Sequence, residues 1–194
     1  MLQKKEIIYR HLLDEYLDKR CSSFTQLELS KRFAVSLSTV SNALIPLREM
    51  GIIEVKARSF ALRDAKKLLL YFATTRNLAK DQLYATRYDA PVMEIEKLVP
   101  ADAMFGAFSA YRLTFKDSPA DYSEVYVYAD PDALKEIKKR FPQKAGPPNI
   151  IVLEADPFIS KGKVSRSQLY VDLWNLKSWY AKEFLDAVEK RLFG

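Results

Sequence analysis

The sequence has few of the residues on which metal and redox chemistry depends. Its 194 residues include one cysteine, Cys21, and one histidine, His11. A single cysteine cannot form a disulfide bond within the chain, and these two residues alone do not complete a structural zinc site. His11 falls beside the apolar stripe of a helical pattern, which favours a partly buried structural histidine over a catalytic base. We therefore expect no metal, no cofactor and no catalytic residue, and the cysteine content indicates a cytoplasmic protein.

The sequence also lacks the glycine motifs of nucleotide-binding proteins and the long apolar runs of membrane proteins. Its five glycines, at positions 51, 106, 146, 162 and 194, do not have the spacing of a P-loop or a dinucleotide fingerprint. The longest unbroken apolar run, residues 68–73, is far shorter than the roughly 20 residues that span a bilayer. Residues 1–6 begin a mixed-charge helical pattern and do not resemble a signal peptide. We expect no membrane partner.

What the sequence does have is enough apolar residues for a core and a moderate excess of positive charge. Hydrophobic residues make up 48% of the chain, and the formal net charge is +6. Residues 1–64 contain 11 Lys/Arg and 8 Asp/Glu, and the other residues contain 20 and 17. The two parts have equal net charge, so charge per residue is about twice as dense in the first part. A basic balance favours nucleic acid or another acidic surface as the partner.

The first third of the chain has three helical patterns followed by an alternating pattern. Apolar spacing predicts helices, with Ser23 capping the second and Ser36 or Ser38 capping the third, and with Leu27, Leu29 and Phe33 among the inner positions. Gly51 is expected to end the third helix in a left-handed conformation. The period then changes to two, which predicts a hairpin. The expected segments are helices over 3–20 and 25–33, a third helix that follows Ser36 or Ser38 and runs to about Met50, and strands over 52–56 and 59–63.

This order of elements is that of a winged helix. Residues 25–44, TQLELSKRFAVSLSTVSNAL, together with residues 47–53, LREMGII, resemble the helix-turn-helix of many bacterial and archaeal regulators. Pro46 departs from the pattern because it removes a hydrogen bond to the carbonyl of Asn42, and it is expected to kink the third helix at a cost of roughly 3 kcal/mol. The reading end of that helix precedes Pro46. Residues 1–64 are therefore predicted to be a winged helix-turn-helix domain that binds double-stranded DNA.

The polar residues of this pattern suggest how DNA would be bound. Short polar side chains at the start of the third helix lie where backbone N–H groups also favour phosphate, and Asn42 can offer a bidentate amide to adenine. Basic residues on the second helix, the third helix and the wing can neutralise flanking phosphates. The alternative for the polar cluster is helix capping and a solvated face, and some winged helices dock only proteins. The candidate residues are Lys31, Arg32, Ser36, Ser38, Thr39, Ser41, Asn42, Arg48, Lys56 and Arg58.

The remaining two-thirds alternate between helical and strand patterns, which predicts a small mixed α/β domain over residues 65–194. The whole chain is thus expected to be of the α+β class. The first helix of this part would join the two domains. The expected helices are 64–75, 92–98, 108–115, 132–141 and 177–193, and the expected strands are 83–87, 124–129, 149–154 and 168–173.

Four segments of this part resemble the AbiEi-type family: FGAFSAYRL at 105–113, VYVY at 125–128, QLYVDLWNL at 168–176 and WYAKEF at 179–184. This family consists of winged-helix transcriptional regulators, many of them antitoxins of type IV toxin–antitoxin systems. The resemblance implies binding to a promoter, often that of the protein's own operon, and a functional link to a nucleotidyltransferase-like toxin without stable contact. A homodimer that spans two half-sites about 34 Å apart is the natural way for such a module to gain specificity.

An enzyme remains an alternative at this point. The stretch from Gly106 to Asp132 is similar to the glycine-turn-helix and acidic strand of nucleotidyltransferases, whose chemistry needs converging carboxylates that hold Mg²⁺. Asp130, Asp132 and Asp172 are the candidates. Asp130 is better explained as a helix N-cap followed by Pro131, and Asp172 as a buried hydrogen-bond acceptor in a strand. A degenerate nucleotidyltransferase-like scaffold without activity is a further interpretation, by analogy of fold alone.

Overall fold

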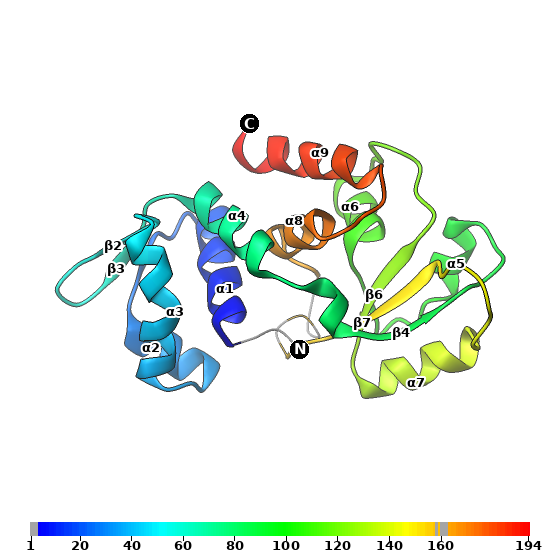
Figure 1. Ribbon diagram of the computed structural model, residues 1–194, viewed down its shortest axis with the longest axis horizontal. Coiled ribbons are helices and arrows are strands. Elements are labelled where there is room, and N and C mark those ends of the chain that lie inside the picture. Colours follow the sequence, from blue (N-terminus) through cyan, green and yellow to red (C-terminus); the bar gives the residue numbers. More distant parts are fainter. Residues whose placement is uncertain (1–3, 158, 160–162) are drawn as a thin grey trace. The chain divides into compact units, whose positions relative to one another are not determined.

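The computed structural model describes residues 4–157, 159 and 163–194 (Figure 1). The chain is of the α+β class, with nine α-helices and two sheets within these residues. It divides into two compact units, one formed by Leu2–Arg76 and the other by Asn77–Leu192. The division therefore falls after Arg76, later in the chain than the boundary after residue 64 that the sequence pattern favours. No described helix is long and apolar enough to cross a bilayer.

The first unit consists of helices and one small antiparallel sheet. The sheet has the order β1-β3-β2, with Ser23 opposite Ala61 and Val55 opposite Phe60. The short strand β1 was not expected, because the sequence pattern there shows only a break between helices. The elements are α1 (Lys4–Lys19), β1 (Ser23–Phe24), α2 (Gln26–Phe33), α3 (Leu37–Glu49), β2 (Ile53–Val55), β3 (Phe60–Leu62) and α4 (Ala65–Thr75).

Local side-chain chemistry determines where α2 begins. The Thr25 hydroxyl accepts a hydrogen bond from the backbone N–H of Glu28 at 3.1 Å, and the Glu28 carboxylate accepts one from the N–H of Thr25 at 3.1 Å. This reciprocal pair is a capping box, which satisfies two backbone donors at once. The expectation that Ser23 caps this helix was wrong, because Ser23 lies in β1.

Helix α3 follows the sequence expectation closely. Gly51 after its end has a φ of +67°, the left-handed conformation that was expected there and that glycine adopts without strain. Pro46 lies in the last turns of a helix that continues to Glu49. The backbone N–H of Met50 bonds the Pro46 carbonyl at 3.1 Å, so hydrogen bonding resumes beyond the proline. The buried positions of α3 are Val40, Ala43, Leu44 and Leu47.

Helix α4 belongs to the first unit because it covers α1. The ring of Phe72 meets the ring of Tyr9 edge-on at 6.4 Å, and both side chains are fully buried. Tyr9 also donates a hydrogen bond from its hydroxyl to the carbonyl of Ala43 at 2.8 Å, which fixes α1 against α3. Leu68 and Leu69 of α4 are buried as well. Without α4, the apolar face of α1 would be exposed to water.

The second unit is built on a four-stranded sheet with the order β4-β7-β6-β5. Strands β6 and β7 are parallel and joined through α7, whereas the two outer pairs are antiparallel. A cluster of buried apolar side chains, among them Val125, Val127 and Val152, packs between the sheet and its helices. The elements are a 3₁₀ turn (Leu78–Asp81), β4 (Gln82–Thr86), α5 (Val92–Leu98), β5 (Met104–Phe105), α6 (Ala107–Phe115), β6 (Val125–Ala129), α7 (Pro131–Arg140), β7 (Ile150–Glu154), α8 (Arg166–Trp174) and α9 (Ala181–Phe193).

The segment 168–173 is a helix, and its prediction as a strand was wrong. Ser165 caps this helix by accepting a hydrogen bond from the Gln168 N–H at 3.3 Å. All six residues of the segment are buried, so the sequence shows no polar face with a helical period. A short apolar run of this kind does not distinguish a buried helix from a buried strand. The last helix begins at Ala181 instead of the expected residue 177.

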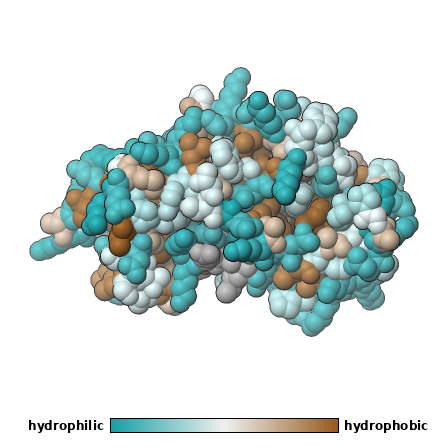
Figure 2. Space-filling model, viewed as in Figure 1, coloured by the Kyte–Doolittle hydropathy of each residue, from teal (hydrophilic) through white to brown (hydrophobic). Residues whose placement is uncertain are grey.

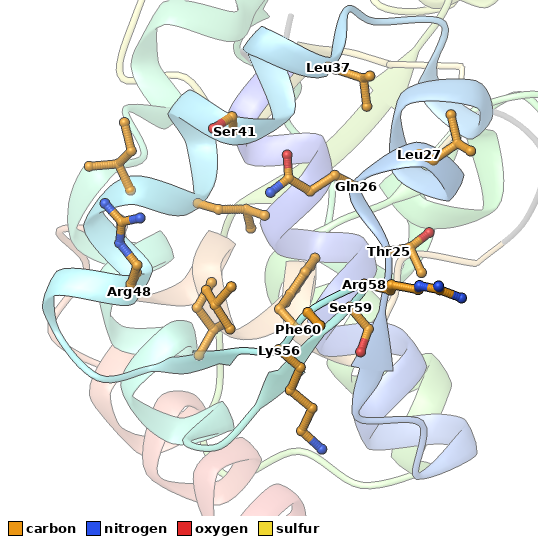
Figure 3. A pocket seen from close by; sticks show the side chains of 15 residues that line it. Thr25, Gln26, Leu27, Leu37, Ser41, Arg48, Lys56, Arg58, Ser59 and Phe60 are labelled. Carbon is orange, nitrogen blue, oxygen red and sulfur yellow. The ribbon is translucent and has the colours of Figure 1, made fainter.

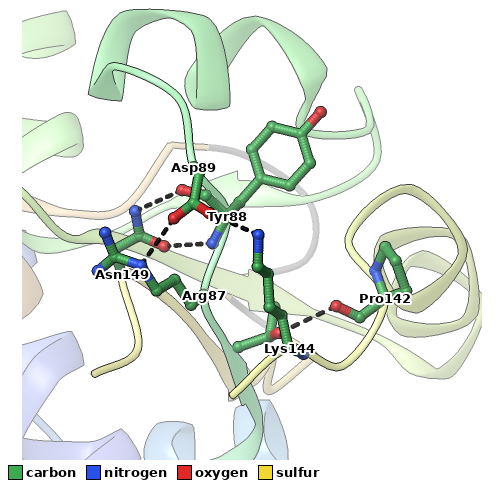
Figure 4. Close-up of polar contacts among 7 residues, drawn as sticks. Arg87, Tyr88, Asp89, Pro142, Lys144 and Asn149 are labelled. Atoms are coloured by element: carbon green, nitrogen blue, oxygen red, sulfur yellow. Dashed lines mark hydrogen bonds and ion pairs between the residues drawn. The ribbon is translucent and has the colours of Figure 1, made fainter. Parts of the chain in front are cut away.

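A polar network fixes the loop before β7 to the end of β4 (Figure 4). The Asn149 side chain accepts a hydrogen bond from the Tyr88 N–H at 2.8 Å and donates one to the Tyr88 carbonyl at 2.9 Å. Asp89 accepts hydrogen bonds from Lys144 and Arg87, and these bonds, that of Lys144 first, lower the pKa of its carboxyl. The polar groups around Asn149 and Asp89 thus form hydrogen bonds to one another.

Candidate nucleic-acid interface

A short turn between α2 and α3 positions the start of α3. The Ser30 hydroxyl donates to the Val35 carbonyl at 2.6 Å, and the Val35 N–H bonds the Ser30 carbonyl at 3.1 Å. Ala34 between them has a φ of 50°, in the left-handed region that ends a helix sharply. The turn that the sequence pattern places at residues 34–36 is confirmed.

The start of α3 carries a cluster of three hydroxyls. Ser36 is the N-cap and accepts a hydrogen bond from the Thr39 N–H at 3.1 Å. The Ser36 hydroxyl oxygen also lies 2.8 Å from that of Ser38 and 2.8 Å from that of Thr39. Ser36 is therefore occupied with capping, as the alternative interpretation held, and Ser38 is exposed at the same end of the helix with its hydroxyl in contact with that of Ser36.

A groove of about 410 Å³ lies between the start of α2, the outer face of α3 and the β2–β3 hairpin (Figure 3). It brings together four of the ten candidate residues, which are Ser41 and Arg48 on α3 and Lys56 and Arg58 on the hairpin. Figure 3 shows the three basic side chains spread around the groove. The fifteen lining residues are Thr25, Gln26, Leu27, Leu37, Ser41, Leu44, Ile45, Arg48, Ile53, Val55, Lys56, Ala57, Arg58, Ser59 and Phe60.

The groove is positively charged. Its lining contains three cations and neither an aspartate nor a glutamate. Arg48, Lys56 and Arg58 form no ion pair with any carboxylate in the described part of the chain. By contrast, Arg63 beside the hairpin is paired with Glu54. The three groove cations are thus available to an anionic partner.

The net charge of the chain is confined to the unit that contains this groove. With the division after Arg76, residues 1–76 hold 14 Lys/Arg and 8 Asp/Glu, and residues 77–194 hold 17 of each. The whole excess of +6 therefore belongs to the first unit. The boundary after residue 64 concealed this, because α4 and its end add Lys66, Lys67 and Arg76 without any acidic residue.

The groove also exposes apolar side chains that the sequence interpretation did not select. Leu27, Leu37, Ile45 and Val55 are exposed by 53%, 50%, 38% and 55%. The placement of Leu27 among the inner positions of α2 was wrong, and only its neighbour Leu29 is buried. Figure 2 shows apolar patches among hydrophilic atoms over α2, α3 and the hairpin. The periodicity of α3 could have revealed two of these residues, because its buried stripe leaves Leu37 and Ile45 outside.

The other candidate residues lie outside the groove. Lys31 and Arg32 are exposed in the last turn of α2, with the Arg32 guanidinium 6.0 Å from the centre of the Phe33 ring. Asn42 is exposed on α3 but does not line the groove. None of these three residues belongs to the lining of the groove.

The three carboxylates of the enzyme alternative are not brought together as a metal site. Asp130 caps α7 by accepting hydrogen bonds from the N–H groups of Asp132 and Ala133, as expected. The Asp132 side chain is exposed and pairs with Lys135 at 2.9 Å. Within the described residues, no group of three or more His, Cys, Asp or Glu side chains is placed to hold a metal ion.

Asp172 is fully buried on α8, so its placement in a strand was wrong while its interpretation as an acceptor is confirmed. Its carboxylate accepts hydrogen bonds from the Tyr128 hydroxyl and from the Gln168 amide, both at 2.7 Å. A Cβ at Gly106 would lie 3.1 Å from the Tyr128 ring and 3.3 Å from the Asp172 carboxylate. The absence of a side chain at Gly106 therefore leaves room for Tyr128 and Asp172. The hydrogen bonds among these buried groups form an internal structural network.

His11 is a mostly buried residue of α1. Its ring meets the ring of Phe33 edge-on at 5.3 Å and that of Phe24 at 6.3 Å, and its side chain is 15% exposed. Burial, followed by the nearby charge of Arg32, lowers its pKa to about 4. At neutral pH the imidazole is therefore uncharged and packs as an aromatic side chain.

Comparison of the chain with models of protein families, with curated proteins and with solved structures gave no match.

Proposed function

We propose that the first unit is a winged helix that binds double-stranded DNA and that the protein is a transcriptional regulator. The element order α1-β1-α2-α3-β2-β3 with the sheet order β1-β3-β2 supports this, because it joins a helix-turn-helix to an antiparallel hairpin. In such a module α3 enters the major groove and the hairpin follows the neighbouring backbone.

The observation that carries the proposal is the groove with three cations and no carboxylate, formed by α3 and the hairpin. A duplex presents a dense row of phosphates, and each cation that neutralises one releases bound counterions. Arg48, Lys56 and Arg58 then hold phosphates along the groove. The net charge of the same unit attracts the duplex from a distance.

The remaining candidate residues have separate roles in this proposal. Exposed Ser38 and Asn42 contact base edges, and the amide of Asn42 recognises adenine. Lys31 and Arg32 bind phosphates beside the start of α3. Ser36 acts through the helix start, which it caps by accepting a hydrogen bond from the N–H of Thr39, and Ser41 faces the groove.

The resemblance to AbiEi-type regulators extends the proposal to the biological role. It supports binding to the promoter of the protein's own operon and a functional link to a nucleotidyltransferase-like toxin. One α3 per chain contacts only a few base pairs, so a homodimer on two half-sites supplies the specificity that a promoter requires.

A protein-docking adaptor is the second candidate function. The four exposed apolar side chains around the groove favour it, because contiguous exposed apolar surface often marks a protein interface. In this case the groove would bind a protein in place of DNA.

The test measures binding of the full chain to labelled DNA from upstream of its own gene and to a random duplex, at two salt concentrations. We expect Arg58→Ala to weaken binding to both duplexes and to reduce the salt slope by about 1. Asn42→Ala should weaken binding to the preferred duplex alone, by about tenfold. The matched control is Lys97→Ala, which removes an exposed cation from α5 and should change neither quantity.

Absence of binding to every duplex at low salt would overturn DNA binding and favour the adaptor. Equal losses on both duplexes for Asn42→Ala would overturn its role in base recognition while leaving DNA binding in place.

A further inference from the structure

Two large apolar side chains lie on the outer face of α3. Leu37 is half exposed at the first helical position, and Ile45 is 38% exposed two turns later. The buried stripe of the helix is on another side, at Val40, Ala43 and Leu47. Folding of the unit therefore does not explain why these two positions are apolar.

The surroundings indicate the chemistry of a partner that would cover them. Both residues line the groove whose charged residues are all cations, so its occupant combines negative charge with apolar contact points. In the major groove of DNA the only apolar group on a base edge is the C5-methyl group of thymine. A duplex with thymines in the right places satisfies both requirements.

We propose that Leu37 and Ile45 contact thymine methyl groups, so that the preferred site has thymines at the positions facing them; this inference rests on the proposed DNA binding. The two residues are eight positions apart on one helix, which corresponds to a rise of about 12 Å. A helix lying along the major groove then places the two thymines about three or four base pairs apart, at roughly 3.4 Å per base pair.

The experiment begins with selection of the preferred duplex from a random-sequence pool by the full chain. Each thymine of the selected site is then replaced singly by deoxyuridine, which lacks only the C5-methyl group. At two positions we expect binding to weaken about fourfold per methyl group removed. Replacement at the other positions should have no effect.

Protein variants assign the two positions to the two residues. Leu37→Ala should bind the thymine and deoxyuridine forms equally at one position, and Ile45→Ala at the other. Because both side chains are exposed, both variants should fold, and circular dichroism checks this. The matched control is Leu98→Ala, an exposed leucine of α5 in the other unit, which should retain the full response to deoxyuridine.

The possible failures separate the two proposals. Tight binding with no response to deoxyuridine at any position would overturn the thymine contact and leave DNA binding intact. An unchanged response in both alanine variants would also overturn the thymine contact. Loss of self-association in sedimentation by the same variants would then assign the two residues to a protein interface. Failure to select any duplex would instead overturn the proposed function.

Discussion

The two units of the chain differ in where they place their charged and polar groups. Residues 1–76 carry the whole net charge and expose three cations around one groove, whereas residues 77–194 are neutral overall. Both units bury some paired polar groups: the first unit buries the ion pair of Arg76 with Glu6, and the second buries Asp172 with the Tyr128 hydroxyl that bonds it. Buried pairs stabilise the fold in both units, so the difference lies in the exposed charge, which only the first unit has in excess and which suits an anionic partner.

This difference shows that the position of a polar residue is more informative than its type. The sequence offered Asp172 as a candidate catalytic carboxylate, yet that carboxylate accepts hydrogen bonds from two buried donors. Arg58 is an ordinary cation in the sequence, yet it lines a groove without a carboxylate. An exposed and unpaired group can bind a partner without giving up an internal contact.

Separating the units should have the largest effect. We expect fragment 1–76 to unfold cooperatively and to bind a duplex at low salt, and fragment 77–194 to bind none. Fragment 1–64 should not fold, because it lacks α4, whose Leu68, Leu69 and Phe72 are buried. Their burial contributes about 6 kcal/mol, comparable to the whole stability of a small domain. Thermal unfolding shows whether each fragment folds, and fluorescence anisotropy measures its binding to a labelled duplex.

Two results would contradict this difference between the units. If fragments 1–64 and 1–76 had equal melting temperatures, α4 would not belong to the first unit. Duplex binding by fragment 77–194 as tight as that by 1–76 would show that net charge and groove do not locate the interface.

Removing the Asp172 carboxylate should have the next largest effect. Asp172→Ala leaves the Tyr128 hydroxyl and the Gln168 amide buried without their acceptor, and we expect a loss of about 3 kcal/mol in the free energy of unfolding. Urea unfolding of the full chain measures it. DNA binding should not change, because the first unit contains the proposed interface.

The control for this experiment is Asp132→Ala, which removes an exposed carboxylate that is paired only at the surface. Its urea midpoint should match that of the unchanged chain. If Asp172→Ala also unfolded at the same midpoint, the buried network would not be structural, and a chemical role for Asp172 would again be open.

Most of the fold could be predicted from periodicity and capping, and the failures share a physical cause. Helix α3 was predicted well because one face is buried and the other is wet, which gives a clear period. Helix α8 was missed because it is buried on all sides, so its sequence has no polar face. The strands β1 and β5, of two residues each, are too short to show any alternation.

The candidate site was predicted in part. The sequence shows which residues are basic, but only the fold brings Arg48 of α3 together with Lys56 and Arg58 of the hairpin. It left open whether Ser36 or Ser38 caps α3, and it could not show that Leu27 faces outward, since both depend on where α2 and α3 begin. The boundary after residue 64 also divided the basic unit, because the burial of α4 against α1 is not visible in one sequence.

A weaker effect is expected from pH, and it should act on the first unit, because the chain's single histidine lies there. Burial and the cations Arg32, Lys19 and Arg10 lower the pKa of His11 to about 4, against the opposing effect of Glu15. The unfolded chain therefore binds a proton at a higher pH than the folded one does. The contribution of His11 to the free energy of unfolding is therefore fully present above pH 6.5 and is lost as the pH falls towards 4. Between pH 8 and pH 5 the loss should be about 2 kcal/mol.

Intrinsic fluorescence can assign this loss to one unit. Both tryptophans, Trp174 and Trp179, lie in the second unit, so their emission reports its unfolding alone, while far-ultraviolet circular dichroism reports both units. Between pH 8 and pH 5 the transition seen only by circular dichroism should move to lower urea, and the fluorescence transition should move less. His11→Gln should abolish the difference between the two shifts, because glutamine does not titrate. Equal shifts in both signals would mean that acid acts through carboxylates of both units, and the histidine would then not distinguish them.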